Sequence, residues 1–351
     1  MMPGRTQVVW EAATWDGLKS WIEKRLGPRD RIGVLVEEGA SYVLPVMEFW
    51  PGRPFIILAH PAGEAGKNWE SLGALLRHML RLGLNRKSAL VVVGGGSLCD
   101  VGGLAAALFM RGIPCIYVPT TLLAMVDAAL GGKTAVNLEG FKNMAGLFKD
   151  PLGVWCDVRF LHSLRPVHFL EGVAEMLKHG LVADENHFAA LAELKDIQLL
   201  KDRPDLLQES QKIKLAITEQ DPEEAGPRRV LNFGHTVGHA LESHFMAKGR
   251  PEPHGVCVAL GMAAETVLSV AYADLAEDAA QHVQKVLFRI FGSVLPKMPN
   301  PDHLIPYMLR DKKNQSGRIH CTLLRKIGQG VWNVGLEKQN IITALQPFDP
   351  S

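Results

Sequence analysis

The fold is decided by SALVVVGGGSLCDVGG, residues 88–103. The stretch opens with an almost wholly apolar, β-prone run at 88–93, continues through three glycines at 94–96, and then resembles the start of a helix. A continuous apolar strand is typical of a parallel sheet that is buried on both faces. Glycines directly after such a strand let the backbone approach a phosphate, and the helix N-terminus that follows attracts an anion. The stretch therefore predicts a strand–turn–helix unit of a parallel α/β domain.

The segments on either side extend this pattern. Residues 31–36, 54–59 and 114–118 also read as apolar strands, and residues 69–82 are amphipathic at helical spacing. After about residue 156, long helical windows replace the alternation of strand and helix. These windows cover residues 167–191, 206–220, 234–244, 256–275 and 277–291. We therefore expect a Rossmann-like α/β domain over residues 1–155 and an all-α, or at least mostly helical, domain over 156–351. A ligand site is expected in a cleft between them.

Composition narrows the class of protein. The 351-residue chain has a formal net charge of +1, which argues against a general nucleic-acid binder. The five cysteines contain no C-x-x-C pair, which is typical of a reduced, cytosolic protein. The N-terminus lacks the pattern of a signal peptide, and the apolar run at 256–270 is too short to span a bilayer. We expect a soluble cytoplasmic protein.

Three loops are candidates for binding a nucleotide or an anion. The glycine loop lacks the G-x-G-x-x-G spacing, but its strand–turn–helix context and Asp100 favour a dinucleotide over a tight turn that binds nothing. Residues 63–67 form a second polar loop that can reach a ribose or phosphate. Lys133 and Lys142 lie in a glycine-punctuated loop that suits an anion, although solvated surface lysines are the commoner case.

Histidines and a carboxylate suggest a metal site. His235 and His239 are four residues apart, on one face of a helix, and His254 follows a short loop later. Neutral imidazoles are good ligands for zinc, although polar residues on a partly buried helix give the same pattern. Glu175 and Lys178 lie three apart among apolar residues, so this carboxylate needs a partner, either the lysine or a metal. Glu175 with two histidines would give the donor set of many catalytic zinc sites.

Taken together, these motifs strongly resemble the 3-dehydroquinate synthase family over residues 54–330. The stretches that carry the resemblance are GGGSLCD (94–100), VPTTLLAMVD (118–127), GGKT (131–134), KN (142–143), AEMLK (174–178), LNFGHTVGH (231–239) and HG (254–255). The resemblance implies a homodimeric, NAD- and divalent-metal-dependent lyase of the shikimate pathway. Its reaction would convert 3-deoxy-D-arabino-heptulosonate 7-phosphate to 3-dehydroquinate and phosphate by transient oxidation, phosphate elimination, reduction and aldol closure. Zinc is the expected metal, with cobalt as the alternative.

The resemblance also implies roles for individual residues. The expected metal ligands are Glu175, His235 and His254. The expected NAD contacts are Glu64, Lys67, Gly95, Gly96, Ser97, Asp100, Thr120, Thr121, Lys142, Phe160 and Ser163. The expected catalytic and substrate-binding residues are Asp127, Lys133, Asn143, Lys178, Lys214, Arg228, Asn232, His239 and Lys312, with Arg111 reaching the phosphate from a partner subunit.

Within the substrate set, the expected anion contacts divide by charge. Lys133, Asn143, Asn232 and Lys312 are expected to hold the phosphate, and Lys214 and Arg228 the carboxylate. His239 is expected to handle a proton rather than to bind the metal. One departure from the family is Val256, which stands where a glutamate is common.

Two alternatives belong to the same superfamily. A sister sugar phosphate cyclase of secondary metabolism would act on a substrate without a carboxylate and would not need both Lys214 and Arg228. A metal-dependent, glycerol-type alcohol dehydrogenase would leave the cluster of Lys133, Lys142 and Lys178 unexplained.

Overall fold

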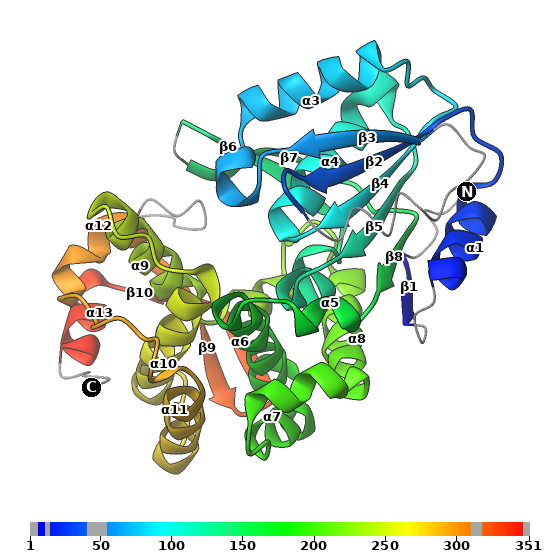
Figure 1. Cartoon of the computed structure of the whole chain (residues 1–351). Coiled ribbons are helices and arrows are strands. Elements are labelled where there is room, and N and C mark those ends of the chain that lie inside the picture. Colours follow the sequence, from blue (N-terminus) through cyan, green and yellow to red (C-terminus); the bar gives the residue numbers. More distant parts are fainter. Residues whose placement is uncertain (1–5, 11–14, 41–54, 140, 310–317, 347–351) are drawn as a thin grey trace. The chain divides into compact units, whose positions relative to one another are not determined.

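Strand β4 (Ala89–Gly94) lies inside a six-stranded, fully parallel sheet (Figure 1). The order across the sheet is β1-β8-β5-β4-β2-β3. The other five strands are β1 (Gln7–Trp10), β2 (Ile32–Glu37), β3 (Phe55–His60), β5 (Cys115–Pro119) and β8 (Gly153–Cys156). The four strands expected from the sequence are confirmed to within a residue at each end. β1 and β8 were not expected.

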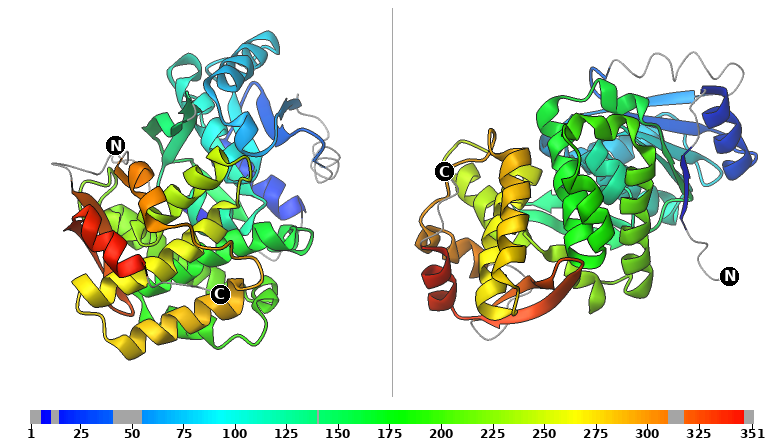
Figure 2. Two further views of the ribbon diagram at one scale, coloured as in Figure 1. Left: turned by 90° about the vertical axis from the view of Figure 1, so that its left-hand side faces the viewer. Right: turned by 90° about the horizontal axis from the view of Figure 1, so that it is seen from below.

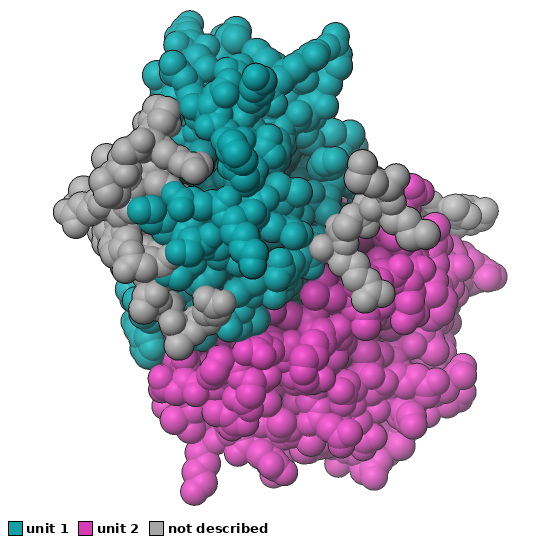
Figure 3. Space-filling model, turned by 90° about the vertical axis from the view of Figure 1, so that its right-hand side faces the viewer, with its two compact units in different colours: residues 1–164 teal, residues 165–351 magenta. Residues whose placement is uncertain are grey.

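This computed structural model describes residues 6–10, 15–40, 55–139, 141–309 and 318–346. The chain divides into two compact units, residues 1–164 and 165–351, which Figure 3 colours separately. The division lies nine residues after the one drawn from the sequence at 155/156, because α5 (Arg159–His162) belongs with the sheet.

Alternating residues of the strands face two different layers. Ile32, Val34 and Val36 pack with Leu18 and Ile22 of α1 (Trp15–Leu26) on one face. On the other face lies α4 (Gly96–Leu108), which approaches closely because it carries Gly102 and Gly103. A Cβ at Gly102 would lie 2.6 Å from Val92, and one at Gly103 would lie 1.9 Å from the Tyr117 hydroxyl. The near-continuous apolar strands are thus buried on both sides, as the sequence predicts.

A hairpin replaces the expected anion-binding loop. β6 (Lys133–Leu138) and β7 (Phe141–Phe148) pair antiparallel, with a register shift between Val136 and Leu138. The expectation of a loop was wrong here, because a strand exposed over most of its length lacks the apolar alternation by which strands are recognised. The remaining elements of the first unit are α3 (Trp69–Arg81) and the short turns η1 (Gly63–Gly66), η2 (Phe109–Arg111) and η3 (Ala124–Ala128).

Over its described residues, the second unit is helical apart from one hairpin. Its helices are α6 (Pro166–Ala183), α7 (Glu185–Ala192), α8 (Pro204–Gln220), α9 (His235–Ala247), α10 (His254–Tyr272), α11 (Glu277–Phe291), α12 (Ile305–Leu309) and α13 (Lys338–Leu345), with short turns η4 (Ile197–Asp202), η5 (Pro227–Asn232) and η6 (Pro301–His303). The hairpin β9 (Ile319–Lys326) and β10 (Gln329–Leu336) packs on α10 and α6 (Figure 2). It corrects the expectation of an all-α domain.

Helix α10 is the core of this unit. Its 19 residues make it long and apolar enough to cross a membrane, contrary to the expectation from the shorter run at 256–270. However, 78% of the apolar 18-residue stretch of this helix is buried inside the protein. The helix packs against α6, α9, α11, α13 and β9. We therefore regard α10 as a core helix.

Candidate active site

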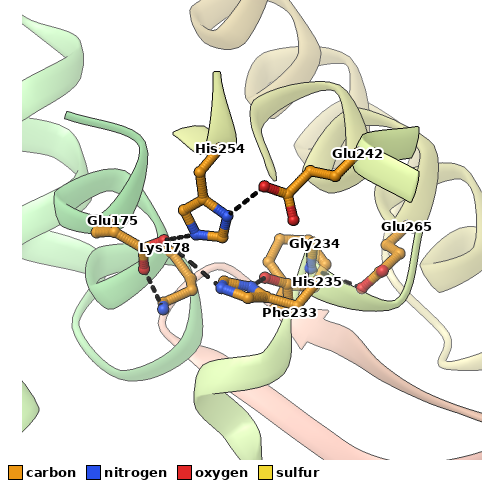
Figure 4. A network of polar contacts seen from close by, with 8 residues as sticks. All are labelled: Glu175, Lys178, Phe233, Gly234, His235, Glu242, His254 and Glu265. Atoms are coloured by element: carbon orange, nitrogen blue, oxygen red, sulfur yellow. Dashed lines mark hydrogen bonds and ion pairs between the residues drawn. The ribbon is translucent and has the colours of Figure 1, made fainter. Parts of the chain in front are cut away.

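Three side chains from separate segments of the second unit meet at one point (Figure 4). Glu175 lies on α6, His235 is the first residue of α9, and His254 is the first residue of α10. The Nε2 atoms of His235 and His254 each lie 3.5 Å from Oε1 of Glu175. The carboxylate is fully buried, and these three donors are close enough together to hold one metal ion.

The second nitrogen of each imidazole is already engaged. His235 Nδ1 lies 3.1 Å from the carbonyl oxygen of Phe233, and His254 Nδ1 lies 3.2 Å from Oε1 of Glu242. A carbonyl or carboxylate at Nδ1 fixes the tautomer that directs the Nε2 lone pair outward. Both Nε2 atoms face the Glu175 carboxylate in Figure 4. The donor set and its supporting contacts therefore fit a divalent metal such as zinc.

Charges around the cluster are unevenly distributed. Lys178, one turn after Glu175, pairs with Oε2 of the same carboxylate. Burial, with Lys178 nearby, lowers the pKa of His235 well below its ordinary value, so this ring is neutral. Burial also opposes the charge on His254, but Glu242 and Glu175 outweigh it and raise the pKa of His254 to about 10. In the metal-free protein, a proton on His254 thus balances part of the charge of the two carboxylates.

The local sequence explains why His235 is held in place. Gly234 adopts φ +78° before α9, and a Cβ there would lie 2.4 Å from Met262. The buried carboxylate of Glu265 then accepts hydrogen bonds from the backbone N–H groups of Gly234 at 2.6 Å and Val237 at 2.9 Å. These are N–H groups at a helix start that would otherwise lack partners. Glu265 of α10 thus fixes the start of α9, where His235 stands.

His239 lies beside the cluster and belongs to a different set of donors. Its ring centre is 5.2 Å from that of His235 and 6.0 Å from that of His254. His239, Glu242 and His254 form a second set of donors close enough for one metal. We favour the first set, because Glu242 then serves as the acceptor that orients His254.

The cationic residues expected to bind anions in this unit are buried on packed elements. Lys178 on α6, Lys214 on α8 and Arg228 on η5 are each 7% exposed or less, and these three elements pack on one another. One guanidinium nitrogen of Arg228 donates to the carbonyl oxygen of Pro222 at 2.6 Å. Asn232 Nδ2 donates to Glu224 at 2.8 Å. Lys312 lies outside the described residues.

In the first unit, the glycine loop stands at the carboxyl edge of the sheet. Gly95 precedes α4 and Gly96 opens it, and a Cβ on Gly96 would lie 2.9 Å from Ala128. Thr120 and Thr121 follow the neighbouring strand β5, and the Thr120 N–H donates to the carbonyl oxygen of Gly94. Phe160 and Ser163 follow β8, which is parallel to β5, so they come from the same edge. A crevice at this edge of a parallel sheet is where dinucleotides bind.

Polar side chains line this loop. Lys67, which is buried, and Asp100, which is partly buried, form an ion pair at 2.6 Å, and Ser97 Oγ donates to Oε1 of Glu64 at 2.9 Å. Burial raises the pKa of Asp100 despite Lys67. Burial also disfavours the charge on Glu64, but Lys67, Lys142 and two hydrogen bonds keep the pKa of that carboxyl below its ordinary value. The expected NAD contacts Glu64, Lys67, Ser97 and Asp100 therefore form one cluster that fits a dinucleotide with its hydroxyls and phosphates.

The remaining expected residues of this unit lie on the hairpin and on two turns. Lys133 opens β6, and Lys142 and Asn143 lie on β7. Asp127 lies on η3. Arg111 ends η2, where Met110 and Arg111 both have positive φ, +49° and +70°.

Four residues close to these groups were not expected from the sequence: Asn137, Glu224, Glu242 and Glu265. Glu242 could have been predicted, because it follows His239 in the motif of residues 232–242. Glu265 offered no local signal, since its partners lie 28 and 31 residues away. Val256 is buried in the core, and Glu242 supplies the carboxylate beside His254.

Comparisons with known proteins agree with this arrangement. The chain matches the N-terminal 3-dehydroquinate synthase family model over residues 57–171 and the C-terminal one over residues 172–314. A 3-dehydroquinate synthase from Parabacteroides distasonis is 39% identical over 326 residues, 92% of each chain.

Two solved structures share the fold over nearly the whole chain. One is 2-deoxy-scyllo-inosose synthase complexed with carbaglucose-6-phosphate, NAD⁺ and Co²⁺, at 25% identity and a TM-score of 0.86, covering 97% of this chain and 96% of that one. The other is 2-epi-5-epi-valiolone synthase from Streptomyces hygroscopicus with NAD⁺ and Zn²⁺, at 26% identity and a TM-score of 0.85, covering 99% and 97%. With both family models matched in order and a relative this similar over most of its length, the chain belongs to the 3-dehydroquinate synthase family.

Proposed function

We propose that the protein converts 3-deoxy-D-arabino-heptulosonate 7-phosphate to 3-dehydroquinate and inorganic phosphate. The observation that carries this proposal is the buried cluster of Glu175, His235 and His254, with Lys178 against the carboxylate, in a chain of this family. A buried metal-binding cluster beside cations suits a substrate that carries hydroxyls and anionic groups.

The proposed cofactors are NAD at the glycine loop of the first unit and Zn²⁺ or Co²⁺ at the cluster of the second. When bound, NAD supplies reversible hydride transfer and the metal polarises a substrate hydroxyl. Support for this choice comes from the two solved relatives, which contain NAD⁺ with Co²⁺ or Zn²⁺.

The protein's own residues hold the substrate by its charges. Lys214 and Arg228 suit the carboxylate, because an ammonium and a guanidinium both donate charge-assisted hydrogen bonds. Lys133, Asn143, Asn232 and Lys312 are proposed to hold the phosphate. Asp127 and Lys178 complete the substrate set. His239 neighbours the proposed metal ligands and is proposed to exchange a proton with the substrate.

We further propose a cytoplasmic homodimer in which Arg111 reaches the phosphate of the partner subunit. Two consecutive residues with positive φ, Met110 and Arg111, support a functional role for this turn, because such backbone strain persists where function needs it. Five free, buried cysteines support a reducing compartment.

A substrate panel tests the proposed function. The purified protein, with NAD and Zn²⁺, is given the heptulosonate phosphate, a sugar phosphate without a carboxylate, or glycerol. We expect phosphate release from the first substrate only. Phosphate release from the second alone would assign a sister cyclase, and NADH formation from glycerol would assign a dehydrogenase. Either result would overturn the proposal.

A further inference from the structure

Asn137 of β6 connects the two parts of the first unit to which a cofactor role and an anion-binding role are assigned. Its side-chain Nδ2 donates to Oε2 of Glu64 at 2.8 Å, and its Oδ1 accepts the backbone N–H of Asn143 at 2.9 Å. Its own backbone N–H donates to the carbonyl oxygen of Lys67 at 2.9 Å. One asparagine therefore contacts the loop at Glu64 and Lys67 and the strand that carries Asn143.

The contact to Asn143 stabilises an irregular part of the hairpin. Asn143 has φ +54°, a left-handed conformation that costs free energy for any residue with a Cβ. It lies within the register shift of the hairpin, where Asn137 is passed over in the pairing of Val136 with Ala145 and Leu138 with Phe141. Such irregularities re-aim side chains next to functional sites. The hydrogen bond from the Asn143 N–H to Asn137 holds this conformation in place.

The contact to Glu64 connects Asn137 to the proposed dinucleotide-binding residues. Glu64 accepts from Asn137 on one oxygen and from Ser97, in the first turn of α4, on the other. Lys67, whose carbonyl accepts from Asn137, pairs in turn with Asp100 of α4. Any shift of Glu64 or Lys67 on cofactor binding is therefore transmitted to Asn137.

An asparagine suits this position because its amide provides a donor for the carboxylate and an acceptor for the N–H at the same time. We infer that Asn137 is a positioning residue that couples cofactor binding at Glu64 to anion binding by the strand that carries Asn143. Thermodynamic coupling of this kind is reciprocal, so each ligand tightens the binding of the other. This inference rests on the proposed function for the identity of the two ligands.

Calorimetry on the full-length protein tests the coupling without any turnover. NAD and inorganic phosphate are titrated separately, and each is titrated again with the other present. In the wild type, we expect NAD to tighten phosphate binding by about fivefold or more, as is typical of coupled sites. In Asn137→Ala, we expect the factor to fall to about one and NAD to bind about fivefold more weakly, the loss expected for one hydrogen bond.

Asn85→Ala is the matched control. Asn85 also makes side-chain hydrogen bonds, to Asp30 and Lys87, but it precedes β4 at the opposite edge of the sheet. We expect this variant to keep the wild-type coupling factor. Equal loss of coupling in both variants, or an unchanged factor in Asn137→Ala, would overturn the inference.

Hydrogen exchange of the wild type gives a second measurement that needs no variant. NAD alone is expected to slow amide exchange in residues 141–148, because it fixes Glu64 and thereby Asn137. If NAD and phosphate each bind but neither affects the other, nor exchange in this strand, the coupling is disproved while the proposed function stands. Failure of NAD to bind at all would instead contradict the proposed function.

Discussion

At the scale of single residues, His235 and His239 show how surrounding groups distinguish two side chains of the same kind. Both belong to α9 and lie four residues apart, but it is His235 that forms a donor set with Glu175 and His254, with its Nδ1 directed to the carbonyl oxygen of Phe233. The sequence motif alone leaves both as candidate ligands. The carboxylate contributed by α6 distinguishes them.

This division predicts different behaviour of two alanine variants. His235→Ala should weaken zinc binding by more than the roughly 10- to 100-fold typical of residues that only orient a ligand. His239→Ala should keep its zinc but lose about 10²- to 10⁴-fold in kcat, as expected for loss of a proton-transfer group. Metal content by mass spectrometry and steady-state kinetics measure both effects. Equal loss of zinc in the two variants would show that the assignment is wrong.

Glu242 carries a prediction of its own. Glu242→Gln removes the charge that faces Nδ1 of His254, so zinc affinity should fall by about 10- to 100-fold. Glu209→Gln, at an exposed ion pair with Lys212, is the control and should bind zinc like the wild type. Competition with a chelator of known affinity measures the difference. An unchanged affinity in Glu242→Gln would show that Glu242 does not support the metal site, and a loss well beyond 100-fold would favour His239, Glu242 and His254 as the ligands.

At the scale of elements, the start of α9 depends on a residue from another helix. The carboxylate of Glu265 accepts from two N–H groups at this helix end and is fully buried. Its removal leaves these donors without a charged acceptor in the core. The position of His235, the first residue of α9, depends directly on this contact.

Glu265→Gln should therefore lower the free energy of unfolding by about 2 kcal/mol or more, since hydrogen bonds to charged groups are the stronger ones. Urea unfolding of the metal-free protein measures the change. Glu277→Gln makes the same substitution in the exposed first turn of α11, where a cost of only about 0.5 kcal/mol is expected. Similar costs for the two variants would argue against a special role for Glu265.

The strands that could be predicted from the sequence differ in burial from β7, which could not. β2, β3, β4 and β5 are recognisable because a parallel strand covered on both faces is continuously apolar. β7 is mostly exposed and carries apolar side chains without alternation, so its pairing with β6 leaves no strand pattern to detect. Likewise, motif spacing indicated Glu175, His235 and His254, whereas Asn137 and Glu265 act through contacts between distant segments that a sequence does not display.

At the scale of the whole molecule, each unit carries a different part of the proposed chemistry. The first holds the glycine loop with Glu64, Lys67 and Asp100, and the second holds the metal-binding cluster. The proposed role of Arg111 would make each site depend on a second copy of the chain, which subunit complementation tests.

Arg111→Ala and His235→Ala should each be nearly inactive when expressed alone. When the two are co-expressed in equal amounts, random pairing in a twofold dimer makes about half of the molecules mixed, each with one complete site, so about a quarter of wild-type activity should return. The recovered activity is measured per total protein. Activity no higher than the mean of the two separate variants would place Arg111 in its own subunit's site.

We propose that this one protein uses NAD as a resident catalyst while it eliminates phosphate and closes a ring. The most direct test supplies one equivalent of NAD per subunit with Zn²⁺ and excess 3-deoxy-D-arabino-heptulosonate 7-phosphate, and follows phosphate, 3-dehydroquinate and NADH together. We expect many turnovers per NAD, with phosphate and 3-dehydroquinate formed in equal amounts and no net NADH. A reaction that stops after one turnover with NADH accumulated and no phosphate released would contradict it.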